Sequence, residues 1–151
     1  MRLAIELALL KTATEGHVSP LGRAKLTAAH IGQFVPLDFR EEPRLAEVTL
    51  GNWDGLTHYE IDMEYPGMLA GADAFDWYFR SPNGESFDEV CGRVRTWLAS
   101  LSCPTVAISQ GLTGRLIKGL YLGLSRRKML ELSGPQDGFS LLANHSLRHI
   151  E

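Results

Sequence analysis

The sequence has 151 residues, of which 44% are hydrophobic and 22% charged, and its formal net charge is −3. A chain of this size and composition can bury a core, so we expect residues 1–151 to form a single domain. The weakly acidic balance provides no basic field for nucleic acid, no apolar run is long enough to span a membrane, and no spacing of His, Cys or carboxylate residues is typical of a metal site.

Residues 1–11 are apolar on most faces, which predicts a helix buried between other elements. Gly16 is the predicted C-cap that ends this segment. A signal peptide is the alternative, but Glu6 interrupts the apolar run and no clear cleavage site follows. We therefore interpret the segment as a structural helix.

The next stretch predicts a short strand ending near Ser19 and then a helix with Ala24, Ala28 and Ile31 on one face. Arg23 falls in the first turn of that helix. This is an unfavourable place for a cation, because the helix N-terminus is itself partly positive. We interpret Arg23 as a ligand for an anion that it shares with backbone amides; a solvated surface arginine is the alternative.

Residues 36–43, which begin within Val35-Pro-Leu-Asp-Phe39, are predicted to form a strand or an extended segment with an acidic exit, and Glu47 follows as one carboxylate among apolar neighbours. A surface charge is the ordinary interpretation of such a residue. A helix is predicted over residues 57–64. The aromatic-rich segment from there to residue 82 predicts an irregular flap of the kind that often covers a site.

The strongest helix signal begins at Ser86, which has capping-box spacing with Glu89. One continuous apolar stripe follows, which we interpret as core: Phe87, Val90, Cys91, Val94, Trp97, Leu98 and Leu101. Cys91 lies on this stripe and Cys103 just before the next strand. Two buried thiols are typical of a reducing compartment, so a cytoplasmic location is expected.

Residues 105–108 form a β-branched, apolar run that predicts a buried strand leading into a helix. Ser109, Gln110 and Gly111 lie at the junction. Ligands of α/β folds bind at such carboxyl ends of strands, where the first N–H groups of a helix attract anions. The junction is therefore the predicted site, although a strand–helix turn without any ligand is also compatible with this stretch alone.

The C-terminal part predicts a turn over residues 135–138 and then a β-hairpin whose strands cover residues 139–143 and 147–151. His145 and His149 alternate with apolar positions in this hairpin. We expect both histidines to face solvent.

Four blocks follow one another along the chain: Ser19-Pro-Leu-Gly-Arg-Ala24; Leu45-Ala-Glu47 with Gly51-Asn-Trp-Asp-Gly55; Gly84-Glu-Ser86; and Val106-Ala-Ile-Ser-Gln-Gly111 with Arg115. Each block is weak alone. The ordered set resembles the histidine phosphatase superfamily, the phosphoglycerate mutase-like proteins, from residue 1 to the last hairpin.

The resemblance implies a three-layer α/β fold with a mostly parallel sheet and helices on both faces. It also implies phosphoryl transfer through a phosphohistidine, without a cofactor. Arg23 and the amides of Gly111 and Leu112 would bind phosphate, and Glu47 would protonate the leaving oxygen. Gln110 stands at the position of the family's second catalytic histidine. The expected ligand is a small phosphorylated metabolite or inorganic phosphate.

The sequence departs from the family pattern at two places. It contains no Arg-His-Gly motif, which carries the nucleophilic histidine on the family's first strand, and Met1 aligns within the helix that follows. The chain is therefore expected to be N-terminally truncated relative to the family. Gln110 can donate to a phosphate oxygen, but a neutral hydrogen bond is about half as strong as a charge-assisted one. His17 and His30 are the nearest histidines, and neither falls on a position that the family uses.

These departures leave two functional classes open. We expect a degenerate member that binds a phosphate compound or a protein partner without turnover. An active phosphatase is the alternative, if the missing motif is supplied. The absent first strand would lie between residues 105–109 and the hairpin, so we expect the hairpin to dock directly beside residues 105–109 or a homodimer to fill the gap with a borrowed strand.

Overall fold

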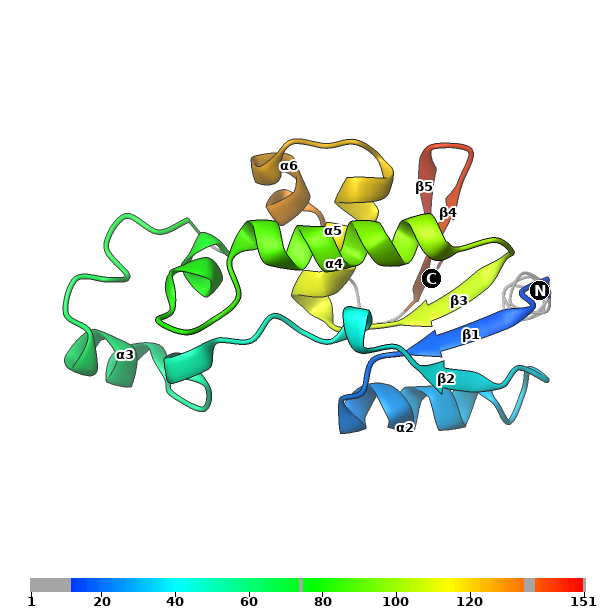
Figure 1. Cartoon of the computed structure of the whole chain (residues 1–151), viewed down its shortest axis with the longest axis horizontal. Helices are drawn as coiled ribbons and strands as arrows, with labels where there is room; N and C mark the ends of the chain where they lie inside the picture. Colours follow the sequence, from blue (N-terminus) through cyan, green and yellow to red (C-terminus); the bar gives the residue numbers. More distant parts are fainter. Residues whose placement is uncertain (1–11, 74, 135–137, 151) are drawn as a thin grey trace. The chain divides into compact units, whose positions relative to one another are not determined.

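The structure is a computed structural model that describes residues 12–73, 75–134 and 138–150 (Figure 1). The predicted helix over residues 1–11 lies outside the described residues. The strands are β1 (Glu15–Val18), β2 (Phe39–Glu41), β3 (Thr105–Ile108), β4 (Phe139–Ala143) and β5 (Ser146–Ile150). The α-helices are α2 (Gly22–Ile31), α3 (His58–Glu64), α4 (Phe87–Ser100), α5 (Gly111–Tyr121) and α6 (Arg126–Glu131), with 3-10 helices at Pro43–Leu45, Gly51–Trp53 and Asp76–Arg80.

The chain divides into two compact units. The first comprises the residues up to Glu47 and from Arg93 onward, and it contains the five strands of the described residues. The second comprises Val48–Gly92 and contains α3 and two of the 3-10 helices. The predicted organisation as a single domain stays a prediction.

The central sheet of the first unit has the strand order β2-β1-β3, and both pairings are parallel. His17 in the middle of β1 is opposite Arg40 on one side and Ala107 on the other. Figure 1 shows the three arrowheads pointing the same way, so the three strands end at one edge of the sheet. The predicted α/β class with a parallel sheet is confirmed.

Helices cover both faces of this sheet. Val18 and Ile108 pack with Ala24 and Ala28 of α2 in one buried cluster. His17 precedes Val18 and therefore points to the opposite face. There its ring contacts Trp97 in the C-terminal half of α4. The predicted arrangement of layers is thus present in the first unit.

The second strand lies within its predicted segment. Residues 36–43 were expected to form a strand or an extended segment, and β2 occupies Phe39–Glu41. Val35 is buried, its N–H donates to Ile31 O, and the N–H of Leu37 donates back to Val35 O. Pro36 between them has no N–H for a sheet ladder. The turn that leaves α2 covers residues 32–34, and the chain joins the sheet only at Phe39.

Gly16 was wrongly predicted as a helix C-cap, because it is the second residue of strand β1. A Cβ atom at this position would lie 2.8 Å from Asp38 O and 2.8 Å from the Phe39 ring. The close approach of β2 thus explains why glycine stands here. Sequence alone does not distinguish this use of glycine from a cap.

The C-terminal hairpin forms as predicted, and His145 and His149 are exposed. The hairpin does not dock directly beside β3, however: β4 and β5 pair only with each other in the described part of the chain. Within those same residues β3 pairs on one side only, with β1. Closure of the gap by a strand from a second copy stays a prediction.

Helix α4 agrees closely with its prediction. The Ser86 N–H donates to the Glu89 carboxylate at 2.7 Å, and the Glu89 N–H donates back to Ser86 Oγ at 3.3 Å. Cys91 is buried on the helix, whereas Cys103 is half-buried.

Over the described ranges, no helix is long and apolar enough to cross a lipid bilayer.

His17 is the most buried titratable residue on the sheet, with 1% of its surface exposed. Its Nδ1 accepts a hydrogen bond from Trp97 Nε1 at 2.9 Å. Its Nε2 lies 2.9 Å from Arg40 Nε and 3.2 Å from the Glu15 carboxylate. Burial, and next the Arg40 guanidinium, lower the pKa of His17 below its ordinary value of 6.5, against the opposing effects of the Glu15 and Glu42 carboxylates.

We therefore expect the free energy of unfolding to fall on acidification. Below about pH 6.5 the unfolded chain binds a proton at His17 that the folded chain refuses, because the folded pKa is the lower one. The contribution of neutral His17 to the free energy of unfolding is thus fully present above about pH 6.5, and it is lost as the pH falls through the lowered pKa of the folded state. Urea unfolding across this range should show a flatter pH profile for His17→Asn than for wild type. The exposed-site variant His149→Asn should keep the wild-type profile; a wild-type slope in His17→Asn would contradict the assignment.

Candidate functional site

The N-terminus of α5 holds the carboxylate of Glu47. The Leu112 N–H donates to Glu47 Oε2 at 3.1 Å, and the Thr113 N–H donates to Oε1 at 2.9 Å. The Thr113 hydroxyl lies 2.9 Å from the same Oε1. These amides are among the first of the helix, which have no acceptor within it. Glu47 and Leu112, two of the predicted site residues, are therefore in direct contact.

The segment that carries Glu47 is fixed from the same junction. Ser109 Oγ donates to Leu45 O at 2.9 Å, and Thr113 Oγ1 is 2.8 Å from Ala46 O. Thr113 has no exposed surface. It was not predicted as a site residue; its only local signal is a hydroxyl at the third position of a helix that starts at a predicted anion site.

Gln110 is the N-cap residue of α5, but its side chain makes no capping hydrogen bond. The residue is 8% exposed, and neither Nε2 nor Oε1 of its amide has a hydrogen-bond partner within the described residues. An unsatisfied buried amide costs about 1–3 kcal/mol. A polar ligand that bonded this amide would remove that cost, so Gln110 is a plain candidate for ligand contact.

Arg23 lies in the first turn of α2, as predicted, and its side chain is exposed. Helix α2 follows β1 and helix α5 follows β3, and the Ser19 N–H joins the ends of these two strands by donating to Ile108 O at 2.9 Å. Both helices consequently begin at the same edge of the sheet (Figure 1). Within the described residues the Arg23 guanidinium bonds to neither Glu47 nor Gln110. Arg23 shares the sheet edge with them without direct contact.

The remaining predicted positions divide in two. Gly111 is exposed at the first position of α5, and its carbonyl accepts from Arg115 Nη1 at 3.3 Å. His17 is buried under Trp97 and His30 is exposed at the end of α2. Neither histidine therefore lies beside the Glu47 carboxylate.

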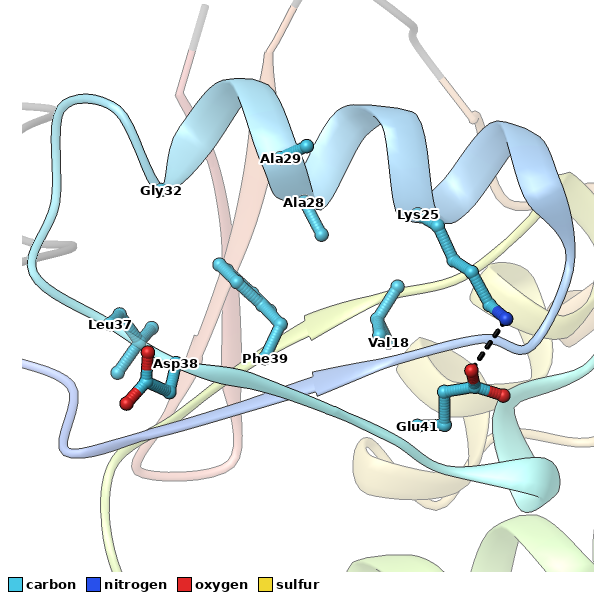
Figure 2. Close-up of a pocket in the computed structure, with 9 residues that line it drawn as sticks. All are labelled: Val18, Lys25, Ala28, Ala29, Gly32, Leu37, Asp38, Phe39 and Glu41. Carbon is cyan, nitrogen blue, oxygen red and sulfur yellow. Dashed lines mark hydrogen bonds and ion pairs between the residues drawn. The ribbon is translucent and has the colours of Figure 1, made fainter.

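A separate groove of about 400 Å³ lies between α2 and β2. Figure 2 shows Val18, Ala28 and Phe39 along it, with the Lys25–Glu41 ion pair of 2.5 Å at one end. Lys25 is thus neutralised by Glu41, and Asp38 adds a further carboxylate to the lining. The carboxylate of Asp38 and the pairing of Lys25 with Glu41 make the groove unfavourable for an anion.

The parallel α/β sheet with a helix N-terminus at its carboxyl edge is the arrangement at which α/β folds bind ligands. The sequence over residues 2–142 matches the histidine phosphatase superfamily (branch 1). The chain belongs to this superfamily.

Some of the curated relatives are named phosphatases. Glucosyl-3-phosphoglycerate phosphatase of Mycobacterium tuberculosis is 41% identical over 85 residues, which are 55% of this chain and 37% of the relative. That of Mycolicibacterium vanbaalenii is 36% identical over 89 residues, 58% of this chain and 35% of the relative. The chain thus matches little more than a third of the length of either relative.

Solved structures show the same similarity. A mycobacterial glucosyl-3-phosphoglycerate phosphatase superposes with a TM-score of 0.70 at 29% identity, covering 88% of this chain and 69% of the other. Its complex with inorganic phosphate gives a TM-score of 0.68 at 27% identity, covering 87% and 72%. The α-ribazole phosphatase of Shigella flexneri, 22% identical with a TM-score of 0.76 over 99% and 82%, shares the fold.

Proposed function

We propose that this chain is a histidine phosphatase homologue that binds inorganic phosphate or a small phosphate ester and has little or no turnover. The observation that carries the proposal is the N-terminus of α5, where two backbone amides serve the Glu47 carboxylate and the buried side-chain amide of Gln110 has no partner within the described residues. Phosphate binding by a solved neighbour of the same fold supports the choice of ligand.

The catalytic part of the proposal comes from the sequence. The family's phosphohistidine chemistry requires a nucleophile, and the 151 residues contain no Arg-His-Gly motif. Gln110 stands for the second histidine; its amide can donate to a phosphate oxygen but cannot form a phosphoryl adduct. Glu47 alone could serve as an acid for a leaving oxygen.

An active phosphatase is the second candidate, and the relatives named glucosyl-3-phosphoglycerate phosphatase favour it. It requires that an Arg-His-Gly segment be supplied to this chain. Its substrate class would be a sugar-linked phosphoglycerate or a similar phosphomonoester. Cytoplasmic location stays a prediction for both candidates.

The site is tested by the substitution Arg23→Ala. Wild-type chain should bind inorganic phosphate weakly, with a Kd on the order of millimolar, because few cationic groups converge. Removing the guanidinium should abolish the heat of binding in a calorimetric titration. Arg95→Ala, which removes an exposed arginine from α4, is the charge-matched control and should bind like wild type. Equal phosphate binding by wild type and Arg23→Ala would place the ligand elsewhere.

A further inference from the structure

Both oxygens of the Glu47 carboxylate are engaged by the N-terminus of α5. Oε2 accepts from the Leu112 N–H, and Oε1 lies 2.9 Å from both the N–H and the hydroxyl of Thr113. The second and third amides of the helix therefore already serve an anion that belongs to the chain itself.

This arrangement changes what an external anion meets. A phosphate approaching α5 finds two amides occupied and a negative charge beside them, and like charges in a partly buried site repel strongly. A separate observation, independent of Glu47, also indicates that this terminus can accept a ligand. The side chain of the N-cap residue Gln110 is more than nine-tenths buried, and its amide group has no hydrogen-bond partner in the described residues.

We propose that Glu47 is the resident anion of α5 and competes with phosphate for its amides, with Thr113 as the residue that positions it. This inference rests on the proposed function, since it concerns the same phosphate site. Phosphate can accept hydrogen bonds from the backbone N–H groups of Leu112 and Thr113 only after the Glu47 carboxylate has left them. The affinity for a phosphate ester is accordingly set by how firmly Thr113 retains Glu47.

The test compares inorganic phosphate binding by wild type, Glu47→Gln and Thr113→Val, measured by calorimetry. Glu47→Gln keeps the shape but removes the charge, so it should bind phosphate at least about tenfold more tightly, in line with the loss of a nearby like charge. Thr113→Val removes only the hydroxyl and should give a smaller increase of a few-fold.

Glu60→Gln is the matched control, because Glu60 caps α3 through Thr57 as Glu47 caps α5. It makes the same charge change and should leave phosphate affinity at the wild-type value. Equal or weaker binding by Glu47→Gln than by wild type would overturn the inference while leaving the proposed function intact. Binding by none of the folded proteins would overturn both. Circular dichroism checks that each variant folds. If Glu47→Gln does not fold, a phosphate affinity of Thr113→Val equal to that of wild type would overturn the inference.

Discussion

Aryl phosphates should be hydrolysed by the 151-residue chain no faster than by buffer, and no phosphohistidine should form. The 151 residues do not include the Arg-His-Gly motif that supplies the family's nucleophilic histidine, and losing a covalent route costs orders of magnitude in rate. The buried His17 does not replace that histidine, because its ring is engaged with Trp97 and Arg40 on the sheet face.

The measurement is release of nitrophenol by highly purified protein, with acid-labile and base-stable incorporation of labelled phosphate as the second readout. Glu47→Gln identifies contaminating activity, since it should leave a contaminant unchanged. Turnover that survives stringent purification and disappears in Glu47→Gln would show that this chain is an enzyme.

Gly16→Ala should destabilise the fold. The added Cβ would meet the Asp38 carbonyl at 2.8 Å, and backbone cannot move aside as a flexible side chain can. Overpacking of this kind costs about 1–3 kcal/mol. The free energy of unfolding in urea measures the loss.

Gly22→Ala is the matched control for this substitution. A Cβ at Gly22 has no atom within 4 Å, and the residue starts helix α2. Its unfolding free energy should stay within about 0.5 kcal/mol of wild type. A Gly16→Ala chain as stable as Gly22→Ala would mean that the Asp38 carbonyl does not lie within 2.8 Å of the Gly16 Cβ position.

Local signals predicted the elements well. The Ser86–Glu89 capping box and the apolar stripe define α4 within the sequence itself, and the structure contains both. The junction at Gln110 was predicted in the same way, from a β-branched run followed by helical spacing. These features depend on residues that are close in the sequence.

Contacts between distant residues could not be predicted in this way. Thr113 meets Glu47 across 66 residues, and Trp97 meets His17 across 80. Nothing near Thr113 indicates that its hydroxyl faces a carboxylate, and nothing near His17 indicates a buried indole. The prediction for Gly16 was wrong for the same reason, because the residue is constrained by the carbonyl of Asp38, just before the neighbouring strand.

The most direct test of phosphate binding at α5 is the response of individual backbone amides in a ¹⁵N NMR titration with inorganic phosphate. In wild type the shifts should concentrate at Gly111, Leu112 and Thr113, and they should be lost in Arg23→Ala. Shifts confined to the groove between α2 and β2, or no shift at α5 at tens of millimolar phosphate, a concentration well above the expected Kd, would contradict phosphate binding at α5.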